Sequence, residues 1–152
     1  MTDDQYYAKE WLNRMYNLSL WIESLEKKRE SVLASLSGIA RYDADFTGSN
    51  GENATETKNI EYSILSEKIE RESEKLAAED IRTLDVICKL GDSKEERLMK
   101  TILNLRYVER YGTWTKIADK IHYSESRTHE YHLQALQAIS EYIPKEIIED
   151  EE

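Results

Sequence analysis

Apolar side chains recur every three or four residues near the start of the chain, and this pattern limits the fold more than any other feature. Its apolar positions are Ala8, Trp11, Met15, Leu18, Ile22, Leu25, Val32 and Leu36, with Arg29 as the one interruption. A period of about 3.5 residues over about four heptads predicts one helix that packs lengthwise against another helix. Leu12, Trp21 and Leu33 widen the stripe, which favours a bundle face over a narrow two-stranded coiled coil.

A second long helix is predicted over residues 59–88. Its apolar face consists of Tyr62, Leu65, Ile69, Leu76, Ile81, Leu84 and Ile87. Gly91 suits the left-handed position that commonly ends a helix. The first helix either folds back on the second as a hairpin, or both helices meet a second copy. So long a seam favours a homodimer, and the pattern leaves both arrangements open.

The two helices are separated by residues 37–58, where the apolar periodicity stops. Three of the five glycines of the chain, Gly38, Gly48 and Gly51, lie in this segment. Because it is longer than most connections, we expect a functional or disordered loop, and disorder is the favoured interpretation. Outside it, helix-breaking residues are rare, with Pro144 as the single proline. The expected fold class is therefore all-α.

Residues 93–144 form the second predicted domain, after an N-terminal region over 1–92. Ser93 and Glu96 have the spacing of a capping box and precede an apolar helical pattern. Thr113 is placed to cap a short helix, and Ser124 to cap a longer one, with a tight turn at His122 and Tyr123 between them. A short helix, a brief turn and a longer helix are the arrangement of a helix-turn-helix.

Three requirements of that motif are met in the sequence. Ala118 is small where two helices must approach closely, and Ile117 and Ile121 lie one turn apart on one face. The serine cap leaves the first turn of the second helix exposed, as entry into a DNA major groove requires. A three-helix bundle that binds only protein is the alternative.

The chain resembles region 4 of bacterial sigma factors over residues 97–139, about a third of its length. Within that group it is most similar to the ArpU- and RinA-like regulators of phage packaging and lysis genes in Gram-positive hosts. The residues that carry the likeness are Glu96-Arg97, Leu103-Asn104-Leu105-Arg106-Tyr107, Trp114-Thr115-Lys116-Ile117-Ala118, Ile121-His122-Tyr123-Ser124, Tyr131-His132 and Ala135-Leu136. The resemblance implies a long N-terminal helical segment before a three-helix domain, and activation of late phage or prophage genes.

The solvent face of the predicted recognition helix, residues 124–140, supplies the candidate base contacts. These are Glu125, Ser126, Arg127, His129 and Glu130, with His132 at the edge of the face. Arg127 is the best candidate for guanine, although an ion pair with Glu130 or Glu125 would also explain it. Glu125 departs from the sigma pattern, where a basic residue is usual. It would accept from cytosine N4 or repel phosphate.

Candidate phosphate contacts flank that helix, and they set the position of a protein on DNA without reading its sequence. They are Arg106, Arg110, Thr113, Lys116, Lys120 and Ser124. For the basic residues among them, an ordinary solvated charge is an equally good interpretation. Trp114 is expected in the core, and Thr128 stands where an aliphatic residue is usual.

Charge is unevenly distributed along a chain whose net charge is −10. Residues 1–93 carry 12 Lys or Arg against 19 Asp or Glu, whereas residues 94–145 carry 9 against 7. The acidic tail, 145–152, has five acids after its first residue. The only net-positive segment is thus the one that bears the motif. We expect salt-sensitive DNA binding with low non-specific affinity.

Several other classes of protein are disfavoured. No apolar run approaches the ~20 residues that span a bilayer, and the acidic start lacks a signal-peptide pattern. Cys88 is the only cysteine, which fits a reducing cytoplasm. No phosphate loop or other catalytic motif is present. His122, His129 and His132 with Cys88 make a poor metal site, so we expect no enzyme, cofactor or metal.

The main rival function is a protein-interaction module that binds RNA polymerase or a host regulator without touching DNA. RNA polymerase is also a candidate second partner of a DNA-bound regulator.

Overall fold

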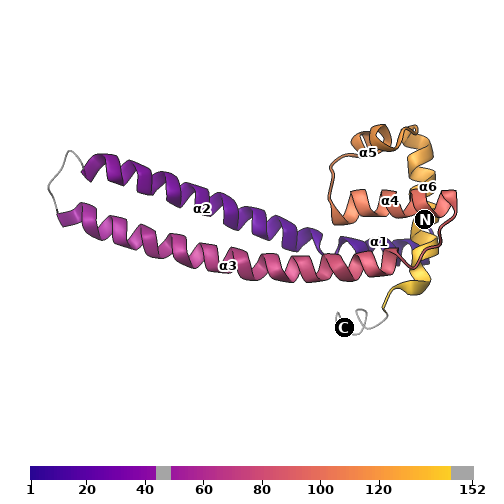
Figure 1. Cartoon of the computed structure of the whole chain (residues 1–152), viewed down its shortest axis with the longest axis horizontal. Helices are drawn as coiled ribbons and strands as arrows, with labels where there is room; N and C mark the ends of the chain where they lie inside the picture. The colour runs from indigo at the N-terminus through magenta and orange to yellow at the C-terminus, as the bar shows by residue number, and fades with distance from the viewer. Residues whose placement is uncertain (44–48, 145–152) are drawn as a thin grey trace. The chain divides into compact units, whose positions relative to one another are not determined.

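The chain is all-α in every part that the structure describes. The computed structural model describes the backbone of residues 1–43 and 49–144, and the side chains of residues 1–38 and 54–144. The helices are α1 (Asp3–Asn13), α2 (Tyr16–Asp43), α3 (Ser49–Ile87), α4 (Lys94–Leu103), α5 (Trp114–Ile121) and α6 (Glu125–Ile139), shown in Figure 1. A π-helical turn over Asn104–Val108 continues α4, and a 3₁₀ turn over Ser140–Tyr142 follows α6. The predicted acidic tail, 145–152, lies outside the described residues.

The helices form two compact units whose boundaries differ from the predicted 1–92 and 93–144. The first unit combines residues 1–16 with residues 78–152, and the second contains residues 17–77. The first helix and the end of α3 therefore belong with the C-terminal helices. The reason is packing, because α1 and the end of α3 supply buried side chains to the same core as α6.

The core of the first unit surrounds the C-terminal half of α6, which packs on α1 and α4 (Figure 1). Its buried side chains are Ala8, Trp11, Leu12, Val86, Ile87, Leu90, Met99, Leu103, Tyr107, Ala135, Leu136, Ile139 and Ile143. Two hydrogen bonds fix α1 on α6. The Gln5 amide donates to the Leu133 carbonyl at 2.9 Å, and the Thr2 hydroxyl donates to Gln137 Oε1 at 2.9 Å.

A break at Arg14 divides the seam that predicted a single first helix. At the end of α1 the Trp11 carbonyl accepts from the Arg14 backbone N–H at 3.2 Å and from the Arg14 guanidinium at 2.9 Å. The same guanidinium donates to a Glu79 carboxylate oxygen and to the Thr83 hydroxyl, each at 3.0 Å. The prediction of one continuous helix was wrong, since the tertiary partners of Arg14 hold the chain in a turn there.

In the second unit, α2 and α3 lie side by side (Figure 1). Arg29, the polar interruption of the seam, donates to the Ser66 hydroxyl at 3.5 Å and lies over the Tyr62 ring at 5.9 Å. Within the described part of the unit, the buried apolar side chains are Ile22, Leu25, Val32 and Ile69.

The connection predicted at residues 37–58 is too long. Helix α2 extends to Asp43 and α3 begins at Ser49, so Gly38 and Gly51 lie within helices. The rest of that prediction, residues 44–48, lies outside the described residues.

Gly91 does not take the left-handed conformation that the sequence predicted, because the only glycine with a positive φ in the described chain is Gly112. The role of Gly91 is to let the backbone approach the Glu96 side chain closely. The Gly91 N–H donates to Glu96 Oε2 at 2.9 Å, and a Cβ built at Gly91 would lie 2.4 Å from that carboxylate. Glu96 also receives the Ser93 N–H at 3.2 Å, which completes the predicted capping box of α4.

Candidate nucleic-acid interface

A turn of three residues joins α5 to α6. Helix α5 begins after Thr113, whose hydroxyl accepts from the Lys116 N–H at 3.4 Å. It ends at His122, whose φ of 62° is left-handed, a conformation that turns the chain sharply. Ser124 then accepts from the Arg127 N–H at 3.1 Å and begins α6. Ile117 and Ala118 are buried on α5, so this short helix is held by packing as well as by its caps.

Helix α6 has a buried half and an exposed beginning. Glu125, Ser126, Arg127, His129 and Glu130 are all exposed, in agreement with the predicted solvent face. Between them Thr128 is fully buried, and its hydroxyl donates to the Ser124 carbonyl at 2.8 Å. Helix α1 bonds to α6 at Leu133 and Gln137, farther along the helix. The first two turns of α6 are therefore open to solvent.

The exposed face is not free of internal partners. Arg127 forms an ion pair with Glu130 at 3.0 Å, and its guanidinium lies 5.1 Å from the Tyr131 ring centre. The hydrogen bond to Glu130 raises the pKa of Arg127. Both side chains of the pair are more than half exposed, so water screens it and the pair is weak. Glu125 accepts from the Thr115 hydroxyl at 2.5 Å, which links the start of α6 to α5.

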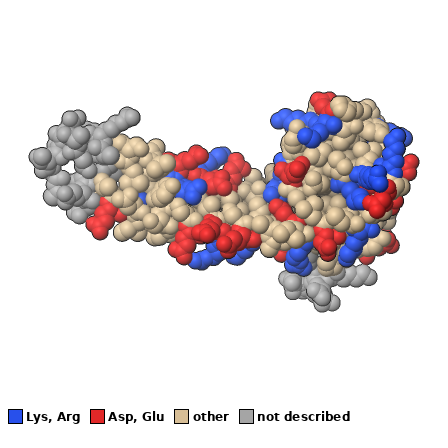
Figure 2. All heavy atoms as spheres, in the orientation of Figure 1, with Lys and Arg blue, Asp and Glu red and all other residues tan. Residues whose placement is uncertain are grey.

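The predicted phosphate contacts fall into two groups. Thr113, Ser124, Lys116 and Lys120 are exposed around α5 and the turn, and Lys120 lies over the Tyr111 ring at 5.0 Å. Figure 2 shows Lys and Arg side chains gathered over the α5 end of this unit, with Asp and Glu side chains beside them.

The two arginines of the set are held by the protein itself. Arg106 donates to the Gly112 carbonyl at 2.9 Å and lies over the Trp114 ring at 4.8 Å. Arg110 forms two hydrogen bonds of 3.2 Å to the two carboxylate oxygens of Asp80. The pair is mostly buried, so Arg110 is not a free cation, and this counts against its predicted contact with phosphate.

His132 is not on the solvent face, where the sequence placed it. It is 5 % exposed, and a 2.6 Å hydrogen bond joins its Nε2 to the Tyr107 hydroxyl. Burial lowers the pKa of His132 to about 3, with smaller contributions from the positive charges of Lys9 and Arg106 and from His129. Burial also raises the pKa of Tyr107. Sequence reasoning missed Lys9, which acts on His132, and Asp80, which binds Arg110. No local pattern connects either pair of residues.

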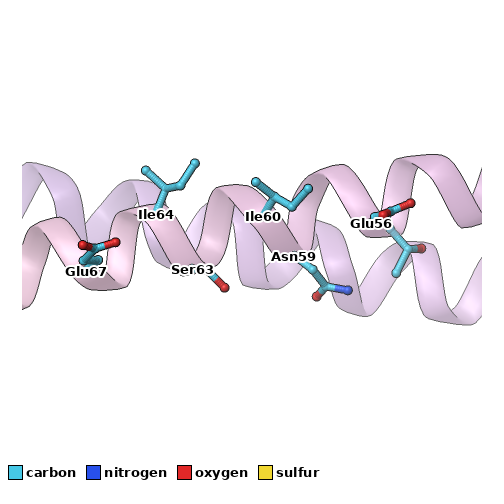
Figure 3. Close-up of a pocket in the computed structure, with 7 residues that line it drawn as sticks. Glu56, Asn59, Ile60, Ser63, Ile64 and Glu67 are labelled. Atoms are coloured by element: carbon cyan, nitrogen blue, oxygen red, sulfur yellow. The ribbon is translucent and has the colours of Figure 1, made fainter.

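A hollow on the surface of the second unit is lined by residues of α3. Its lining includes Ile60 and Ile64, which project from the same side of the helix, with Glu56 and Glu67 at its two ends (Figure 3). The described residues contain no cluster of three His, Cys, Asp or Glu side chains suited to a metal ion. None of the described helices is long and apolar enough to span a membrane.

Comparisons with models of protein families, with curated proteins and with solved structures give no match. The geometry of α5 and α6 and the residues exposed there are what indicate a function.

Proposed function

We propose that the chain is a sequence-specific DNA-binding transcriptional regulator in which α5 and α6 act as a helix-turn-helix and α6 enters the major groove. The observation that carries this proposal is the division of α6. Its C-terminal half is fixed in the core, whereas its first two turns present five polar side chains to solvent. A recognition helix needs both properties, because its N-terminal residues must reach base edges from a rigid support.

Arg127 is proposed to contact guanine and Glu125 to accept from cytosine N4, with Ser126, His129 and Glu130 completing the base-contacting face. To contact DNA, Arg127 must give up its ion pair with Glu130, and Glu125 must give up its hydrogen bond from the Thr115 hydroxyl. Both contacts are at the surface, so the exchange replaces one solvated interaction with another.

Lys116, Lys120, Thr113 and Ser124 are proposed to bind phosphates on either side of the groove. Because few of these groups are cationic and much of the chain is acidic, non-specific affinity should be low. Binding should still weaken with salt, since each contact between a lysine and a phosphate releases a counterion. The resemblance to ArpU- and RinA-like proteins extends the proposal to activation of phage or prophage late genes. RNA polymerase is then a second proposed partner.

The second unit supports the further proposal of a homodimer. Two helices alone bury only one stripe of side chains, which is marginal for a stable unit. Trp21 and Ile60 remain 53 % and 54 % exposed, and Leu33 and Ile64 are also exposed. A second copy would bury such side chains in a helical bundle. Light scattering should then give about twice the chain mass of 17.9 kDa, and a clean monomer would contradict the dimer.

A gel-shift survey of the DNA around the protein's own gene, at about 50 and 200 mM salt, tests DNA binding. We expect one intergenic fragment to give a discrete shift that weakens with salt. The variant Arg127→Ala/Lys116→Ala should abolish that shift and remain folded, since both side chains are exposed. The control Lys89→Ala/Lys94→Ala removes the same charge from exposed sites outside α5 and α6. No preference over random duplex at either salt concentration would refute the proposal.

The alternative is a helical module that binds RNA polymerase or a host regulator without direct DNA contact. The exposed apolar side chains of α2 and α3 favour a protein partner of some kind. Under this alternative the Arg127→Ala/Lys116→Ala variant keeps full partner binding, and no duplex is selected in the survey.

A further inference from the structure

A small cavity opens in the first unit between α1, the π-helical turn, the start of α5 and the middle of α6. Its volume is about 210 Å³. Lys9 and Asn13 of α1, Arg106 of the turn, Trp114 of α5, and His129 and His132 of α6 contribute to its lining. Residues far apart in the sequence thus bring polar side chains to one hollow. None of the residues assigned to base contacts except His129 takes part in it.

The lining carries positive charge and no carboxylate. Lys9 and Arg106 are both part-buried, and the wall contains neither Asp nor Glu. Within the described residues Lys9 has no acidic partner, in a chain whose net charge is −10. Burial is the main cause of the depressed pKa of His132, and the charges of Lys9 and Arg106 lower that pKa further. A hollow lined by two part-buried cations without carboxylates attracts anions.

The hydrogen-bonding groups of the cavity fit an oxygen-rich anion. An ammonium has three N–H donors and a guanidinium has five, of which Arg106 gives one to the Gly112 carbonyl. The Asn13 amide, the Trp114 indole and the His129 ring add further N–H groups. Two cations match the double negative charge of a phosphate group, and charge-assisted hydrogen bonds are the strong ones.

We propose that this cavity binds a phosphate group, with Lys9 and Arg106 as its two cations and Asn13 as an additional donor. The phosphate has two possible sources, the backbone of bound DNA and a free phosphorylated small molecule. The first source rests on the proposed function and makes α1 part of the DNA-binding surface. The second makes the cavity an effector site beside His129 of α6.

The free phosphate is tested by NMR on the full chain, which contains three histidines. Inorganic phosphate is titrated against sodium chloride of equal ionic strength while the ring signals are followed. His129 and His132 should shift saturably, whereas His122, which lies in the turn outside the cavity, should not. Lys9→Gln should weaken the saturation about tenfold or more, and Lys9→Arg should restore it. Lys94→Gln is the matched control, an exposed lysine outside the cavity.

DNA as the source is tested by the salt dependence of duplex binding. If a backbone phosphate occupies the cavity, Lys9→Gln should reduce the slope of log affinity against log salt by about 0.9, and Lys94→Gln should not. If the ligand is a free phosphate, the slope stays unchanged and only the NMR titration responds. The site is refuted if Lys9→Gln changes neither measurement. If the chain binds no DNA, the proposed function fails, and the phosphate titration alone still decides the cavity.

Discussion

Mild acid should destabilise the protein through His132, well above the pH at which carboxylates protonate. His132 is 5 % exposed, and the positive charges of Lys9 and Arg106 surround it, so the folded protein keeps it neutral until about pH 3. In the unfolded chain the same ring has a pKa near 6.5. Between these values only the unfolded state binds the proton, so stability is complete above about pH 6.5 and falls as pH is lowered.

The size of the loss follows from the two pKa values. One pH unit within the window is worth about 1.4 kcal/mol, so lowering the pH from 7 to 5 should cost about 2 kcal/mol of unfolding free energy. Hydrogen bonding to Lys100 lowers the pKa of Asp92, and hydrogen bonds from Ser93 lower that of Glu96. The stability from depressed carboxyl groups is present above their unfolded pKa values of 3.8 and 4.5 and is lost below them. The carboxyl groups thus act only below about pH 4.5, and the loss between pH 7 and pH 5 comes from His132.

Urea unfolding followed by circular dichroism at pH 7 and pH 5 measures the loss. His132→Gln is the informative variant, because its amide can still bond to the Tyr107 hydroxyl but cannot titrate. The variant should be less stable than the wild type at pH 7 and should lose about 2 kcal/mol less between the two pH values. If both proteins lose the same free energy, or if the His132 ring titrates near 6.5 in the folded wild type, the reasoning is wrong.

Three further predictions follow from single contacts and from the shared core. Gly91→Ala should lower the unfolding free energy by up to about 1 kcal/mol, measured by thermal melts, because its methyl group displaces the Glu96 carboxylate from the cap of α4; an unchanged melt would show that this side chain moves aside without loss. Asp80→Asn should release Arg110, lowering thermal stability while raising non-specific duplex affinity in gel shifts; unchanged values for both would show that the ion pair has no role. A fragment of residues 93–152 should give no cooperative melt, since it lacks six buried side chains of the core, and the Val, Leu and Ile side chains among them are each worth about 1.5–3 kcal/mol. A cooperative melt would show that the core is complete without them.

The starts of the C-terminal helices could be predicted because capping is local chemistry. Ser93, Thr113 and Ser124 each accept from a backbone N–H three residues later, so the signal and its partner lie in one short stretch of sequence. The exposed beginning of α6 follows from the same logic. Its first turn comes directly after a cap, and only Thr128 points inward there.

Helix ends and the register of the buried helix faces were harder to predict than helix starts, since they depend on contacts between distant residues. A regular 3.6-residue pattern places Leu98 on the buried face of α4, yet Met99 is the buried residue. Beyond α4 the π-helical turn, closed by the Glu109 N–H on the Asn104 carbonyl at 2.8 Å, changes the register. Leu105 and Tyr107 are both buried as a result. No residue type in this segment signals the wider turn.

The exposure of the five candidate base-contacting residues could be predicted from the sequence, but the internal partners of other site residues could not. Arg110 with Asp80 and His132 with Tyr107 join residues 30 and 25 positions apart. Both pairs change the chemistry of a predicted site residue. One neutralises a cation proposed for phosphate, and the other removes a histidine from the solvent face. Pairing of this kind is a property of the folded unit and leaves no periodic trace in the sequence.

The apolar seam at the start of the chain shows why the domain boundary could not be predicted from periodicity. The pattern continues without change of spacing through Arg14, yet Ala8 and Trp11 pack in the core of α6 while Ile22 and Val32 are buried in the other unit. Periodicity predicts that a helix face is buried, but it does not predict which other residues bury it. Here the residues of one seam are buried in two different units. Residues 1–16 therefore help to support α6, and a change in α1 can alter the proposed recognition helix without touching it.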